Sequence, residues 1–213
     1  MTRIANFIAV SSTVLLAITL AGLVKRGTWR QWYAFTANIA IIAAFSIGNR
    51  LWPRVFYVPE VWTIEQNVLN AVRFTMALEL AVRTFQPFPG ARATLRVVLL
   101  AVLVATFAMV APAASGGGDY QRFLEEVQPR LLNGSVLVFT AIAALILWYR
   151  LPVAPLHKAI LLGYVPYLLF QLVYLHAFVA RSWESKIIGY VNQAAYLVLV
   201  AYWAWAAWRR PPS

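Results

Sequence analysis

Amide, carboxylate and guanidinium side chains lie within stretches of this chain that are otherwise apolar. The densest group falls between residues 61 and 83 and comprises Thr63, Glu65, Gln66, Asn67, Asn70, Arg73, Thr75 and Glu79. Gln66, Asn70 and Arg73 follow one another at spacings of four and three residues, so a helix would carry them on one face. A guanidinium cannot lose its proton, and at the centre of a membrane helix it costs at least about 2.5–3.5 kcal/mol. Arg73 must therefore face protein, water or an anion, and we predict that it marks a binding site.

Further amide and phenol groups occur in two later apolar stretches, and Ser46, Asn49 and Arg50 come at the end of an earlier one. The residues that we predict to line a ligand site are Arg73, Glu65, Gln66, Asn70, Gln171, Tyr174, Asn192, Gln193 and Tyr196. An alternative stays open for each single amide or phenol, because such groups also form the hydrogen bonds that tie membrane helices together.

The elements that must position these side chains are helices that span a bilayer. Hydrophobic residues make up 62% of the 213 residues and charged residues only 12%, against roughly 25% charged residues in a soluble domain. Seven apolar stretches approach the roughly 20 residues that a spanning helix needs. They cover approximately 4–24, 31–51, 61–83, 94–112, 131–149, 156–179 and 187–208. We predict an all-α polytopic membrane protein, in which residues 1–213 form a single transmembrane domain, a bundle of seven transmembrane helices.

The connection over residues 113–130 is longer than the other predicted loops. Tyr120, Phe123, Leu124 and Val127 recur there at helical spacing, opposite polar residues. This pattern predicts an external loop with a short interfacial helix. The three helices before the fourth stretch and the three after it have matching directions, so a 3+1+3 organisation by duplication is open as well.

Lysine and arginine residues are concentrated in alternate loops, which predicts the orientation. One side carries Lys25, Arg26, Arg30, Arg83, Arg92, Arg96, Arg150, Lys158, Arg209 and Arg210, whereas the basic residues of the other side are fewer and mixed with acidic ones. Because basic loops stay in the cytoplasm, we predict a multi-pass protein of the inner (cell) membrane with its N-terminus outside and its C-terminus in the cytoplasm. The net charge of +11 then needs no nucleic-acid partner. The predicted partners are the lipid bilayer, anionic lipid headgroups at the cytoplasmic face and, in one reading, other membrane subunits.

No cofactor or metal site is predicted, and no catalytic motif marks the chain as an enzyme. The chain has no cysteine, and its two histidines, His157 and His176, are 19 residues apart on one predicted helix. That spacing corresponds to about 28 Å, so the pair cannot hold one haem or metal ion. Retinal would need a lysine inside 187–208, where none occurs. Ligation of a chlorophyll-type pigment by His157 or His176 alone stays open.

Several weak motifs are spread over most of the chain. They are Glu65 and Glu79 in one predicted helix, the turn Phe85-Gln86-Pro87-Phe88-Pro89, and Asn192 with Tyr196 in the last helix. In these features the chain resembles small seven-helix bacterial integral membrane proteins of unassigned function. The resemblance implies the fold and a membrane location, and it carries over no catalytic or binding residue.

Most of the polar positions map to the outer half of the predicted membrane region. The expected function is therefore the binding or transport of a small ligand in an outward-facing polar pocket, with Arg73 as the partner of an anion. The alternative is a non-catalytic accessory or structural subunit of a larger membrane complex, with exposed aromatic and small residues as its partner surface.

The predicted orientation can be tested with reporter fusions. A reporter that is active only in the cytoplasm should be active when it is fused after Arg210, because this end follows the basic side of the bundle. The same reporter inserted in the 113–120 loop should be inactive. The reverse pair of results would contradict the orientation.

Overall fold

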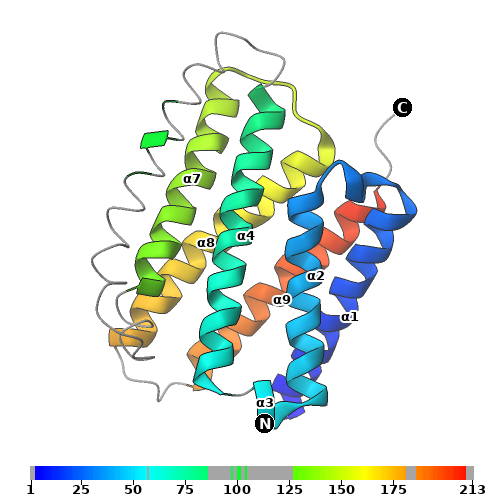
Figure 1. Cartoon of the computed structure of the whole chain (residues 1–213), viewed down its shortest axis with the longest axis vertical. Coiled ribbons are helices and arrows are strands. Elements are labelled where there is room, and N and C mark those ends of the chain that lie inside the picture. Colours follow the sequence, from blue (N-terminus) through cyan, green and yellow to red (C-terminus); the bar gives the residue numbers. More distant parts are fainter. Residues whose placement is uncertain are drawn as a thin grey trace. The chain divides into compact units, whose positions relative to one another are not determined.

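The computed structural model describes residues 3–56, 58–85, 127–180 and 186–209 and a few single positions between 97 and 104, without the side chains of 175–180 and 186–188. Every regular element in this part of the chain is helical, which confirms the predicted all-α class there. The elements, labelled as in Figure 1, are α1 (Arg3–Lys25), the short 3₁₀ helix η1 (Thr28–Arg30), α2 (Tyr33–Leu51), α3 (Pro53–Phe56), α4 (Pro59–Phe85), α7 (Gln128–Trp148), α8 (Pro155–Ala180) and α9 (Lys186–Trp208).

Four of the described helices are long and apolar enough to cross a membrane. They are α1, α2, α7 and the part of α8 from Pro155 to Tyr174. Helix α4 has the length of a span, with 27 residues, but it carries the charged residues Glu60, Glu65, Arg73, Glu79 and Arg83. The predicted stretch 94–112 and the predicted interfacial helix lie almost wholly outside the described residues, and Gln128–Arg130 belong to α7. The bundle of seven spans therefore stays a prediction.

The chain divides into two compact units. Unit 1 comprises Met1–Tyr57 and Ala154–Ser213, and unit 2 comprises Val58–Val153. Unit 1 contains α1, α2, α3, α8 and α9, and unit 2 contains α4 and α7.

In unit 1, α1 packs along both α2 and α9, and α9 also packs on α8. The buried Trp203 of α9 joins these helices, since its ring lies 5.3 Å from Phe35 of α2 and 4.8 Å from Tyr164 of α8. Asn38 of α2 donates a hydrogen bond of 2.7 Å from Nδ2 to the Tyr164 hydroxyl. Gly163 leaves room for the indole, because a Cβ at this position would lie 2.6 Å from Trp203 Nε1. Aromatic packing and one buried hydrogen bond thus hold three helices around Trp203.

One end of unit 1 is closed by contacts between the last turns of α1 and α9. Trp208 donates from Nε1 to the carbonyl of Ile18 at 3.0 Å, and Lys25 lies over the Trp208 ring at 5.2 Å from its centroid. The Arg26 guanidinium donates to the carbonyls of Ala207 and Arg209. A cation at the C-terminus of α9 is favourable because free carbonyls and the helix dipole make that end negative.

In unit 2, α4 packs on α7. The small buried residues Gly134 and Ser135 of α7 allow close approach of a neighbouring helix. Near the end of α4, Arg83 and Glu79 form an ion pair at 3.0 Å, as their spacing of one turn predicts. Pro129 falls in the first turn of α7, where the missing N–H costs no helical hydrogen bond.

Replacement of Gly163 tests the packing around Trp203. The variant Gly163→Ala should lower the free energy of unfolding by about 1–3 kcal/mol, because the added methyl overlaps a buried ring that has little room to move. The measurement is the thermal midpoint of the purified protein in detergent. Gly189→Ala is the control, since a Cβ there meets no described atom within 4 Å. Equal midpoints for both variants would contradict the packing.

Candidate functional site

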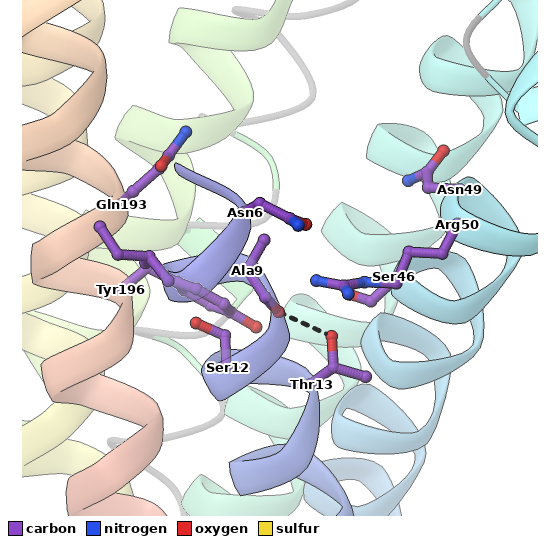
Figure 2. A pocket seen from close by; sticks show the side chains of 10 residues that line it. Asn6, Ala9, Ser12, Thr13, Ser46, Asn49, Arg50, Gln193 and Tyr196 are labelled. Carbon is purple, nitrogen blue, oxygen red and sulfur yellow. Dashed lines mark hydrogen bonds between the residues drawn. The ribbon is translucent and has the colours of Figure 1, made fainter. Parts of the chain in front are cut away.

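Polar side chains of α1, α2 and α9 line a pocket of about 230 Å³ in unit 1 (Figure 2). The lining residues are Asn6, Ile8, Ala9, Ser12, Thr13, Ser46, Asn49, Arg50, Gln193 and Tyr196. They come from the first half of α1, the last turns of α2 and the first half of α9. This is the end of unit 1 opposite the Trp208–Ile18 contact. We call it the polar pocket.

The inner wall of the polar pocket contains hydrogen-bonding groups that are buried without a partner. Ser12 is only 6% exposed, and neither its Oγ nor the Oε1 of Gln193 has a hydrogen-bond partner in the described part of the chain. Thr13 differs, because its hydroxyl donates to the Ala9 carbonyl at 2.9 Å, the dashed line in Figure 2. A buried polar atom without a partner costs about 1–3 kcal/mol, so Ser12 and Gln193 are groups that a ligand would satisfy.

The rim of the polar pocket is positively charged. Among the described lining residues, Arg50 is the only one with a charged side chain, and it is exposed, as is Asn6. Figure 2 shows the Arg50 side chain extending from α2 toward α1. With an arginine and asparagine amides at its opening, the pocket favours a carboxylate or another small anion.

The short helix α3 helps to fix the part of α2 that carries Arg50. Phe56 of α3 packs back on α2, with its ring centroid 6.1 Å from that of Phe45. Gly48 makes this approach possible, because a Cβ there would lie 2.6 Å from the Phe56 ring. Asn49 and Arg50 follow Gly48 directly. The packing of the Phe56 ring against Gly48 therefore sets the position of the rim.

A second group of polar side chains is linked within unit 2. Arg73 donates to Asn70 Oδ1 at 3.0 Å, Asn70 donates to Gln128 Oε1 at 3.2 Å, and Gln128 donates to Gln66 Oε1 at 3.1 Å. We call these four residues the amide chain. Gln128 of α7 thus bonds to two residues of α4, Asn70 and Gln66, and Arg73 joins through Asn70 on the same face of α4. The amide chain links α4 to α7, as interhelical hydrogen bonds do.

The predicted site residues accordingly fall into three sets. Gln193 and Tyr196 line the polar pocket, and Gln66, Asn70 and Arg73 belong to the amide chain. Glu65, Gln171, Tyr174 and Asn192 are half-buried on α4, α8 and α9 and belong to neither. A single site built from all nine residues stays a prediction.

Sequence reasoning missed the contribution of the first helix. Asn6, Ser12 and Thr13 line the pocket, yet the stretch 4–24 was expected to be a plain span. A signal was present, because Asn6 and the run Ser11-Ser12-Thr13 are the polar residues nearest the start of that stretch. Gln128 was also missed, since it fell in a predicted loop.

No metal site emerges in the part of the chain that the structure describes, where His, Asp and Glu do not gather in groups of three or more. His157 is buried in unit 1 and its ring packs edge-on against Trp32, with centroids 5.3 Å apart. The side chain of His176 lies outside the described residues.

The amide chain predicts a difference between two amide-to-leucine substitutions. Gln128→Leu should lower the free energy of unfolding by about 1–2 kcal/mol, because Asn70 and Gln66 lose their cross-helix partner. Asn67→Leu, on the exposed side of α4, should leave it unchanged. Thermal unfolding in detergent measures the stability of both variants. A Gln128→Leu protein as stable as the parent would refute the role of the amide chain in holding α4 to α7.

Comparison with known proteins does not identify a family for this chain. No family model matches the chain, and neither a curated protein nor a solved structure matches it.

Proposed function

We propose that this protein binds a small anionic ligand in the polar pocket. The supporting observation is the combination of Ser12 Oγ and Gln193 Oε1, both buried without a described partner, with the Arg50 guanidinium at the same opening. The first two groups would exchange hydrogen bonds with a hydroxyl group of the ligand. Arg50 would pair with a carboxylate. Together they fit a small hydroxy-carboxylate.

The size of the pocket supports a ligand of this class. A volume of about 230 Å³ is below the roughly 300–1,000 Å³ of pockets that hold drug-sized molecules. A compact polar acid fits such a space, whereas a nucleotide or a pigment does not.

The predicted orientation places the polar pocket at the outer end of α1, α2 and α9. Binding from outside would then be the first step of uptake or sensing, and transport by this protein is part of the proposal. Arg50 takes the role of anion partner that the sequence suggested for Arg73. The guanidinium of Arg73 stays a second candidate, because its hydrogen bond to Asn70 leaves other N–H groups for an anion.

Thermal stabilisation by ligands tests the proposal directly. The full chain, purified in mild detergent, is heated with glycolate, lactate, acetate or the neutral ethylene glycol. The hydroxy-carboxylates should raise the midpoint by several degrees at saturation, because a ligand that binds only the folded state stabilises it. Acetate should act more weakly, and ethylene glycol should have no effect.

Two pocket variants separate binding from structure. Arg50→Gln should weaken binding by about 10- to 100-fold, which corresponds to the loss of one charge-assisted hydrogen bond. Ser12→Ala should also weaken binding but should not lower the stability of the free protein, since the hydroxyl has no described partner to lose. Arg54→Gln, an exposed arginine of α3 outside the pocket, is the control and should bind as the parent does.

The opposite results would refute the proposal. If none of the acids changes the midpoint, or if Arg50→Gln and Arg54→Gln respond alike, the pocket does not bind such anions. Stoichiometric co-purification of other membrane proteins, together with the absence of any ligand effect, would support the accessory-subunit alternative instead.

A further inference from the structure

A second and larger cavity of unit 1 lies where the end of α1 meets the start of α8 and the end of α9. Its volume is about 630 Å³. Its described lining includes the cations Arg26, Lys158 and Arg209 and the aromatic residues Trp32, Tyr202 and Trp205, and none of these described residues is acidic. We call it the basic cavity. Three positive charges around one cavity, with no carboxylate among the described lining residues, favour an anion there.

The three cations differ in how far their N–H groups are already used by contacts within the protein. Arg26 donates to the carbonyls of Ala207 and Arg209, so its guanidinium already serves the end of α9. Arg209 lies over the Trp205 ring, 5.0 Å from its centroid, and this contact leaves the edge of the guanidinium open to a ligand. Lys158 is exposed in the first turns of α8. No described carboxylate pairs with any of the three, so Lys158 and Arg209 can bind an anion.

The basic cavity also has an apolar side. Leu162 follows Lys158 by one helical turn on α8, and its side chain is 55% exposed. Trp205, on the facing part of α9, is 54% exposed. A molecule held by Lys158 and Arg209 can therefore continue along an apolar surface. A free anion would leave that surface unused, whereas a lipid would cover it.

We propose that the basic cavity binds the headgroup of an anionic phospholipid. The phosphate would contact Lys158 and Arg209, and the first part of the acyl chains would lie against Leu162 and Trp205. The distribution of basic residues predicts that this end of unit 1 is cytoplasmic, and the cytoplasmic leaflet carries the anionic lipids that attract such clusters. The site is independent of the polar pocket at the other end of the unit.

Binding is tested with the full chain in a detergent that carries no charge. Short-chain phosphatidylglycerol, phosphatidylcholine of the same chain length and inorganic phosphate are each titrated while the thermal midpoint is followed. Phosphatidylglycerol should raise the midpoint at concentrations at least about tenfold below those needed for phosphatidylcholine or inorganic phosphate. Lys158→Gln and Arg209→Gln should each weaken the phosphatidylglycerol effect by about tenfold, as expected for the loss of one charge-assisted contact.

Arg30→Gln is the matched control, because Arg30 is an exposed arginine at the same end of unit 1 but lies over Trp29 and does not line the cavity. It should respond as the parent does. Three results would overturn the proposal. Equal effects of phosphatidylglycerol and phosphatidylcholine, or equal responses of Lys158→Gln and Arg30→Gln, would show that the cavity does not select an anionic lipid. Equal effects of inorganic phosphate and phosphatidylglycerol would assign the site to free phosphate.

Discussion

A polar group inside a helix bundle has no bulk water to bind. This constraint divides the buried polar side chains into those with a partner in the protein and those without a described one. The amide of Asn38 meets the Tyr164 hydroxyl, and Gln128 meets Asn70 and Gln66. These groups are matched within the protein, so their role is to fix neighbouring helices. Ser12 and Gln193 carry oxygens that are buried without a described partner, and both border a pocket. Because an unpaired buried polar group costs free energy, the paired amides hold helices together, whereas Ser12 and Gln193 are candidates for binding a ligand.

The two ends of unit 1 differ in chemistry although α9 contributes to both of them. On α9, Gln193 and Tyr196 line the polar pocket, while Tyr202 and Trp205 line the basic cavity about two turns further along. Between them Trp203 is buried against Phe35 and Tyr164. Since this aromatic layer is packed without room for even a methyl at Gly163, the two cavities are separate sites.

Much of the fold could be predicted from hydropathy, because each spanning helix must satisfy its own backbone and cover about 20 apolar residues. The helical face of Gln66, Asn70 and Arg73 followed from spacing alone. Spacing does not show which other helix packs against that face of α4. For this reason Gln128, the partner of Asn70 and Gln66, was missed. Ser12 was missed for the same reason, since its role comes from the packing of α1 against α2 and α9. Partners across helices depend on packing that a one-dimensional pattern does not contain.

The charge asymmetry of the polar pocket also predicts how a ligand would lie in it. Arg50 is exposed at the rim, where water lowers the cost of its charge, and the buried wall at Ser12 is uncharged. A charge moved to that wall would lose its hydration without a counter-charge, whereas a hydroxyl group there gains hydrogen bonds. A small acid would therefore enter with its polar neutral end first and keep its carboxylate at Arg50. Release toward the opening would then need only one ion pair, that of the carboxylate with Arg50, to break at the surface.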